Sequence, residues 1–375
     1  GRGSASPIDL LTDGAPTLLR QCVAGHATLG DVQCCHAVCS RWHQQAVEHT
    51  WLKHCVSCGN VLAAERRGLW WHCAGVPALA ARRCQQAEGE ERPESATAQA
   101  FEQLSTRDLP RERIHEIERD VCRTFPTHPK FSGEGAAAVA SRGDLLRVLR
   151  AVVAAEPEVG YCQGMNFVAA TLLIHLRSAS DAFWVLLAMI ERCNFRHLFS
   201  PGVPLLPLRV FQFSGVVRER LPRLWRHLKD ESFSLDIFAH QCVLTLFAYS
   251  IDPDFLKHVY DLFFLLGWKA VFQIGLGLLA SLEHRLLDMS VEDISRFMHQ
   301  CKRFVTPGGA GGSDSDIRGA LHGLLRFEVS DAMLEGLQRS FQLERWEVLL
   351  ARAGDEGDPA AGEPLPAGLE RSATG

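Results

Sequence analysis

Apolar residues recur along this chain with the spacing of helices, and the alternation typical of strands is nearly absent. In residues 144–157 the apolar side chains share one helical face, Asp144 can cap the start, and Pro157 and Gly160 end the segment. That face carries Leu145, Val148, Leu149, Val152 and Val153. Residues 165–176 are apolar all round, as expected of a central helix. The sequence therefore predicts an all-α fold.

Other helices are predicted from caps and breaks. Residues 207–228 are amphipathic and interrupted at Pro222, which cannot continue the hydrogen-bonding of a helix. A capping box predicts a further helix that ends near Arg303. The candidate capping residues are Ser180 or Asp181, Ser234, and Ser290 with Asp293.

Polar stretches divide the chain. Residues 85–95 are charged and predict a surface loop, and residues 306–316 are rich in Gly and Ser and predict a flexible linker. A C-terminal helical pair is predicted over 317–352. The tail, 353–375, is rich in Ala, Gly, Pro and acidic residues, so we expect it to be disordered.

One apolar stretch, residues 262–282, is long enough to span a bilayer. Lys269 and Gln273 lie near its middle, and a charge at the centre of a spanning helix is costly. We therefore predict two buried helical pieces joined near Gly267 and Trp268.

Composition excludes several classes of protein. The formal net charge of −5 gives no indication of nucleic-acid binding. The 13 cysteines are scattered and often lie in apolar runs, which favours reduced thiols and a cytoplasmic protein. The first residues contain no apolar run typical of a signal peptide.

Residues 114–129 hold the first candidate site. Asp120 and Arg123 are three residues apart at the end of a predicted helix that Pro126 stops. One interpretation is an arginine that complements the negative helix end and pairs with the aspartate. The other is an arginine that Asp120 holds ready for a partner.

The stretch GYCQGMN, residues 160–166, is the second candidate. One interpretation is a glycine turn whose Asn166 caps the next helix. The other is that the turn presents Gln163, whose amide can donate and accept hydrogen bonds and so orient a water molecule.

Arg67 and Trp71 form the third candidate. They are four residues apart, so they fall on one face of a helix, where the guanidinium can stack on the indole. Such a pair is typical of a structural element.

Taken together, these three motifs resemble the TBC domain, the helical domain of Rab GTPase-activating proteins. The family's pattern R-G-x-x-W, I-x-x-D-x-x-R-T-x-P and Y-x-Q-G-M-N is matched in order, and the resemblance covers roughly residues 60 to 300. The matching residues are Arg67, Gly68, Trp71, Ile117, Asp120, Arg123, Thr124, Pro126, Tyr161, Gln163, Gly164, Met165 and Asn166. We therefore expect a TBC-type domain over 60–305.

The resemblance implies an activator rather than an enzyme that hydrolyses GTP alone. Arg123 would be an arginine finger that stabilises charge on the transferring phosphoryl group, and Gln163 would position the attacking water. Asp120 would orient Arg123, while Tyr161 and Asn166 would shape the turn. No phosphate-binding loop is present, so GTP and Mg²⁺ would belong to the partner, and no cofactor or metal is expected.

Two positions depart from the family pattern. Cys242 follows Gln241 where the family usually has Trp, and Tyr260 precedes Asp261 where it again usually has Trp. Both are interpreted as packing or partner-facing positions that bear on GTPase preference.

Residues 8–57 lie outside the TBC-like part. One interpretation is a small amphipathic helical extension; the other is a segment similar to an F-box, which would bind a Skp-type adaptor of a cullin ubiquitin ligase. The F-box-like residues are Leu29, Asp31, Val32, Val38, Cys39, Trp42, Trp51 and Cys55. Cys55 and Cys58 lack a second pair of regular spacing, so no zinc site is expected.

Three functions thus remain open. The first is a GTPase-activating protein for a Rab-type GTPase, working in the cytoplasm or peripherally at endomembranes. The second is a scaffold that binds such a GTPase without accelerating hydrolysis. The third is a ubiquitin-ligase adaptor that recruits the GTPase as cargo.

Overall fold

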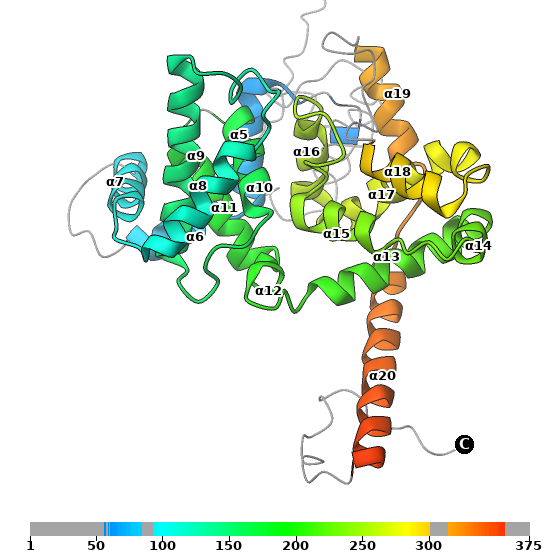
Figure 1. Cartoon of the computed structure of the whole chain (residues 1–375). Coiled ribbons are helices and arrows are strands. Elements are labelled where there is room, and N and C mark those ends of the chain that lie inside the picture. Colours follow the sequence, from blue (N-terminus) through cyan, green and yellow to red (C-terminus); the bar gives the residue numbers. More distant parts are fainter. Residues whose placement is uncertain are drawn as a thin grey trace, which may run out of the picture. The chain divides into compact units, whose positions relative to one another are not determined.

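The computed structural model of the chain describes residues 56–57, 59, 61–84, 93–176, 178–300 and 314–356. Every regular element among these residues is an α-helix, so the prediction of an all-α fold is confirmed (Figure 1). The chain divides into two units, residues 1–329 and 330–375.

The first unit contains fifteen helices within the described residues. In chain order they are α5 (Ala63–Cys73), α6 (Val76–Cys84), α7 (Pro93–Ser105), α8 (Arg111–Arg123), α9 (Ala136–Ala155), α10 (Met165–His175), α11 (Ala179–Arg192), α12 (Phe195–Phe199), α13 (Leu206–Arg220), α14 (Pro222–Asp230), α15 (Asp236–Thr245), α16 (Leu256–Leu266), α17 (Trp268–Leu286), α18 (Val291–Gln300) and α19 (Asp314–Leu324).

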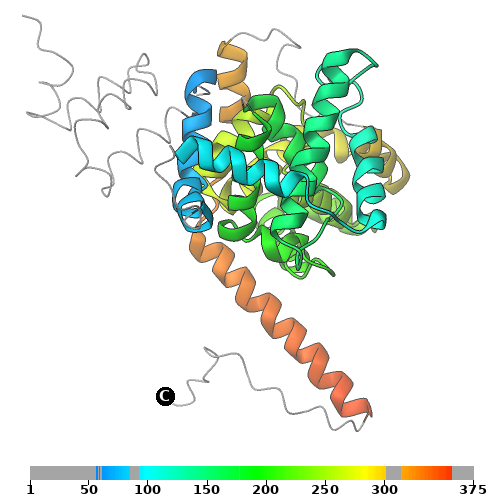
Figure 2. The ribbon, with the colours of Figure 1, turned by 90° about the vertical axis from the view of Figure 1, so that its left-hand side faces the viewer.

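The amino-terminal helices assemble around α9, α10 and α11. Helix α9 packs against α7, α8, α10 and α11, and Figure 2 views this group from the side that α7 covers. Helix α10 is buried from Met165 to Leu173 apart from Phe167. A helix that is apolar on every side has no face for solvent, so α10 forms the centre of the unit, as predicted.

The carboxy-terminal helices assemble around α17. This helix contacts α13, α15, α16 and α19, and α10 joins the two groups through contacts with α15 and α16. Gly267, at φ 64°, separates α16 from α17, which confirms the predicted break in the apolar stretch. No helix among the described residues combines the length and apolar character needed to cross a bilayer.

Two predicted helix starts and the end of one predicted loop are wrong. Helix α9 begins at Ala136, eight residues before Asp144, because its first turns are Ala-rich and need no buried face. Ser178, rather than Ser180 or Asp181, caps α11, accepting the Asp181 amide at 3.1 Å. Helix α7 begins at Pro93, within the predicted loop of 85–95.

Other predicted boundaries are confirmed. Pro222 separates α13 from α14. Ser290 and Asp293 form the expected start of α18, with the Asp293 amide 3.4 Å from the Ser290 hydroxyl. Helix α15 begins directly after Leu235, its N-cap residue, so Ser234 lies one position before the cap, where its hydroxyl accepts the Asp236 amide at 3.2 Å.

The unit boundary separates the two helices predicted for 317–352. Helix α19 packs on α17 within the first unit, whereas the second unit contains α20 (Asp331–Glu356). Helix α20 also runs four residues into the predicted tail. The F-box-like segment lies outside the described residues except Val56 and Ser57, as do most of the linker and the rest of the tail.

Candidate functional site

The end of α8 presents an arginine that a buried carboxylate holds. Ile117, Asp120 and Val121 face the core, so the last turn of this amphipathic helix leaves Arg123 facing solvent. The Arg123 Nε donates to Asp120 Oδ1 at 2.9 Å, and Arg123 Nη2 lies 2.7 Å from the same oxygen. The Arg123 side chain is 53% exposed and that of Asp120 only 10%. The aspartate therefore orients an arginine that remains accessible.

Tyr161 joins this pair to the turn before α10. Its hydroxyl donates to Asp120 Oδ2 at 2.6 Å. Burial raises the pKa of the Tyr161 phenol well above its ordinary value, and the nearby Asp120 carboxylate raises it further. Tyr161 consequently stays protonated and acts as a donor over the physiological pH range.

A second connection runs through Thr124 and Asn166, both buried. The Asn166 side-chain amide donates to the Thr124 hydroxyl at 2.8 Å, and the Thr124 hydroxyl donates to the Asp120 carbonyl at 2.6 Å. The Asn166 side-chain oxygen accepts the Gly164 amide at 3.1 Å. The end of α8 and the turn before α10 therefore form one hydrogen-bonded unit.

Gly164 lets the turn pass close to α15. It adopts φ 116°, and a Cβ at this position would lie 3.0 Å from the carbonyl oxygen of Leu244. A side chain would thus bring both backbone strain and a contact with backbone atoms. The position requires glycine for reasons of conformation and space.

Gln163 lies on this turn and is exposed. Within the described part of the chain its side-chain amide has no hydrogen-bond partner, whereas its polar neighbours Tyr161 and Asn166 are buried and bonded. The buried side chains of Tyr161 and Asn166 thus fix the turn, and the side chain of Gln163 is available to a molecule outside the chain.

The structure does not bring Arg67 and Trp71 into this cluster. The Arg67 guanidinium lies 4.9 Å from the Trp71 ring centroid, and Arg67 Nε donates to Asp181 Oδ2 at 2.8 Å. These residues join α5 to α11, which agrees with the structural interpretation of the motif.

The buried pair on this helix is instead Arg66 and Trp70, which the sequence analysis did not single out. Arg66 Nε lies 3.0 Å from Asp261 Oδ1, and the Trp70 indole donates to that oxygen at 2.7 Å. Both pairs have the same four-residue spacing, so the spacing cannot indicate which one faces inward. No local pattern in the sequence separates the two pairs.

The two departures from the family pattern are packing positions. Cys242 is 1% exposed in α15, and Tyr260 is fully buried, with its ring centroid 5.5 Å from that of Trp70. Neither side chain reaches the surface. Among the residues that the structure describes, no group of three or more His, Cys, Asp or Glu is placed to hold a metal ion.

Similar proteins share both sequence and fold with this chain. The sequence model of the Rab-GTPase-TBC domain matches residues 64–287. TBC1 domain family member 4 of Mus musculus is 33% identical over 207 residues, which are 55% of this chain and 15% of that protein. GTPase-activating protein GYP5 of Saccharomyces cerevisiae is 31% identical over 192 residues, which are 51% of this chain and 20% of that protein.

The fold agrees with two solved structures. The Chlamydomonas flagellar RabGAP TBC domain superposes with a TM-score of 0.59 at 19% identity, covering 84% of this chain and 96% of that one. The Ypt/Rab-GAP domain of Gyp1p gives a TM-score of 0.56 at 14% identity, covering 82% of this chain and 98% of that one. The structure is thus an all-helical domain of the TBC type.

The matched sequence model spans more than half of the 375 residues. The chain belongs to the Rab-GTPase-TBC domain family. It spans 15% and 20% of the length of the two relatives above, so their remaining parts have no counterpart in the comparison.

Proposed function

We propose that this chain accelerates GTP hydrolysis by a Rab-type GTPase, with Arg123 and Gln163 acting in trans. One observation carries the proposal. The exposed Arg123, held by the buried Asp120, belongs to the same hydrogen-bonded unit as the turn that carries the exposed Gln163. Family membership supports the partner class, since relatives include GTPase-activating proteins by name.

The residue types suit the chemistry. Phosphoryl transfer builds charge on the γ-phosphate oxygens and needs one water molecule held in line. Asp120 engages Arg123 through Nε and Nη2, and in the described part of the chain Nη1 has no partner. The N–H groups of Nη1 can therefore donate to phosphate oxygens, and a neutral amide such as Gln163 can hold the water. GTP and Mg²⁺ are the partner's in this proposal.

The test is single-turnover GTP hydrolysis across a panel of Rab proteins, with the wild-type chain and with Arg123→Ala and Gln163→Ala. We expect Arg123→Ala to lower the accelerated rate by about 10³- to 10⁵-fold, as for other arginine fingers. Arg119→Ala is the matched control, because Arg119 is an exposed arginine on the same helix. It should leave the rate unchanged.

Two results would contradict the proposal. Acceleration that survives the double substitution Arg123→Ala with Gln163→Ala would place the chemistry elsewhere. Binding of a GTP-loaded Rab without acceleration would favour the scaffold. The F-box-like interpretation of 8–57, the Skp-type adaptor and the association with endomembranes stay predictions.

A further inference from the structure

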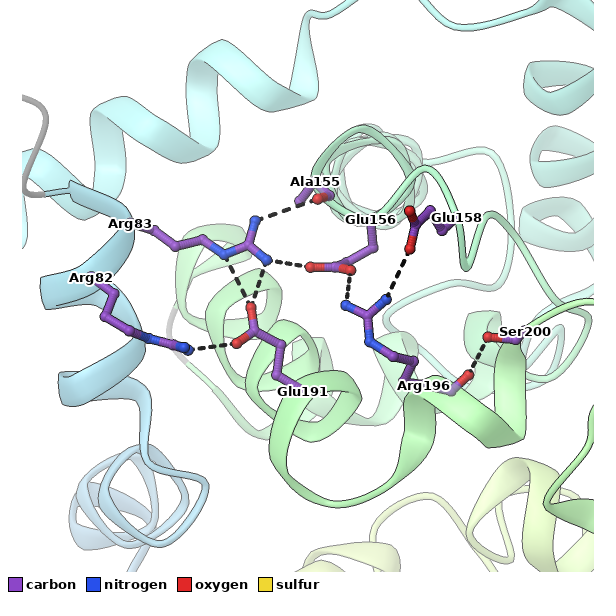
Figure 3. A network of polar contacts seen from close by, with 8 residues as sticks. All are labelled: Arg82, Arg83, Ala155, Glu156, Glu158, Glu191, Arg196 and Ser200. Atoms are coloured by element: carbon purple, nitrogen blue, oxygen red, sulfur yellow. Dashed lines mark hydrogen bonds and ion pairs between the residues drawn. The ribbon is translucent and has the colours of Figure 1, made fainter. Parts of the chain in front are cut away.

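A buried glutamate ends the helix that leads to the Gln163 turn. Glu156 follows the last residue of α9 and is 5% exposed. Arg83 of α6 donates to one of its carboxylate oxygens, and Arg196 of α12 donates to the other (Figure 3). Two arginines from separate helices therefore hold both oxygens of one carboxylate, an arrangement with little freedom to rotate.

The surrounding charges complete a balanced cluster. Glu191 accepts from Arg83 Nε at 3.0 Å and from Arg82 at 2.6 Å, and Arg196 lies 3.8 Å from Glu158 (Figure 3). An open cavity of about 370 Å³ borders the cluster and is lined by Arg82, Arg83, Glu191 and Arg196. Since three arginines face three glutamates, the cluster needs no external anion. We therefore look for a structural role of this cluster within the chain.

Backbone hydrogen bonds connect Glu156 to the turn that carries Gln163. The carbonyl oxygen of Glu156 accepts the amides of Val159 at 3.1 Å and Gly160 at 2.9 Å. Gly160 adopts φ 66°, and Tyr161 follows at once with its hydrogen bond to Asp120. The loop before Gln163 is thus fixed at Glu156 on one side and at Tyr161 on the other.

We infer that Glu156 is a positioning residue for Gln163. Its carboxylate is held by Arg83 and Arg196, and it fixes the loop that determines the position and orientation of the Gln163 side chain. This inference rests on the proposed function. Because Glu156 is buried, we place its action in the backbone of 156–161 rather than in a contact with the nucleotide or the partner. A displacement of a catalytic group by about 1 Å lowers the reaction rate on the order of a hundredfold. Loss of the Glu156 contacts should therefore have a measurable effect on the rate.

The experiment compares Glu156→Gln with wild type in single-turnover hydrolysis at increasing concentrations of the activator. Gln keeps the shape of the side chain but removes the charge that holds the two arginines. We expect the maximal rate to fall roughly ten- to a hundredfold while the half-saturating concentration stays unchanged. Arg82→Gln is the matched control, since Arg82 contacts Glu191 and not Glu156. It should behave as wild type.

A double substitution separates positioning from general destabilisation. If Glu156 acts through Gln163, adding Glu156→Gln to Gln163→Ala causes no further loss, whereas a merely structural effect multiplies the two losses. Amide exchange supplies a readout besides rate: Val159 and Gly160 should exchange faster in Glu156→Gln than in wild type. Where Glu156→Gln fails to fold, Arg196→Gln removes the other side of the clamp and should give the same pattern.

The outcomes are distinct. An active wild-type chain with an unchanged rate in Glu156→Gln overturns the inference alone, as do multiplying losses in the double substitution. A wild-type chain that accelerates no Rab overturns the proposed function and the inference together.

Discussion

Arg66 and Arg67 are adjacent residues in very different environments. The Arg66 side chain is 4% exposed against a fully buried Asp261, whereas Arg67 is 31% exposed against Asp181 at 9%. A buried carboxylate that loses its cation has no water to replace it. The Arg67–Asp181 pair is open to solvent on the arginine side, so its loss costs less.

This difference predicts unequal costs for two similar substitutions. Arg66→Leu should lower the free energy of unfolding by about 3–5 kcal/mol, since it leaves the buried Asp261 carboxylate without its charge partner. Arg67→Leu should cost only about 1 kcal/mol. Urea unfolding of both variants measures the two losses. Equal losses would contradict the assignment of Arg66, rather than Arg67, to the buried position.

At the scale of elements, small residues decide how closely helices approach. Helix α19 lies on α17 at Gly277, where a Cβ would come within 2.4 Å of the backbone of Leu324. Leu321 and Leu324, both buried, are the residues by which α19 contributes to the core. The contact involves backbone atoms, so a side-chain rotation cannot relieve an added methyl group.

We therefore expect Gly277→Ala to displace α19. Overpacking of this kind costs about 1–3 kcal/mol, and amide exchange over 314–324 should become faster. Gly319→Ala is the matched control, because Gly319 lies on α19 itself with nothing within 4 Å of its would-be Cβ. That change should be neutral or stabilising by up to about 1 kcal/mol. Identical exchange in the two variants would contradict the packing described for α19.

For the molecule as a whole, two histidines link stability to pH: His258, which is buried, and His175, which is partly buried. Burial lowers the pKa of His175 from 6.5 to about 4, although its hydrogen bond to the Pro253 carbonyl partly opposes this. Burial also lowers the pKa of His258 from 6.5 to about 3, with Lys257, Arg66 and His175 adding to the effect. Among the residues that the structure describes, neither ring nitrogen of His258 has a hydrogen-bond partner.

Proton binding determines the direction in which pH changes the free energy of unfolding. Below pH 6.5 the unfolded chain protonates these rings and the folded chain does not, so acid favours unfolding. Each histidine removes about 1.4 kcal/mol of stability per pH unit as the pH falls from 6.5 toward 4. This sensitivity disappears above pH 7.5, where the rings are neutral in both states.

His258→Leu should remove one of the two contributions. The slope of unfolding free energy against pH should fall by about 1.4 kcal/mol per unit between pH 6 and 4.5. Urea unfolding at several pH values measures this slope, and the difference between wild type and variant should be constant above pH 7.5. An unchanged slope would mean that His258 is protonated in the folded chain.

The sequence by itself determined the fold class, most helix breaks and the pairing of Asp120 with Arg123. Periodicity and Pro222 or Gly267 act locally, through backbone geometry, so they can be recognised without knowledge of the fold. Asp120 and Arg123 are three residues apart on one helix, so their pairing was predictable. Their roles as fingers or supports stay predictions.

Only the tertiary structure decided which polar residues meet across the chain. Tyr161 reaches Asp120 over 41 positions, Arg196 reaches Glu156 over 40, and Arg66 reaches Asp261 over 195. Such contacts depend on how α5, α8, α9, α12 and α16 pack, and no local pattern encodes that packing. The Glu156 clamp could not be read from the sequence for the same reason: its two arginines come from helices on opposite sides of α9 in the chain.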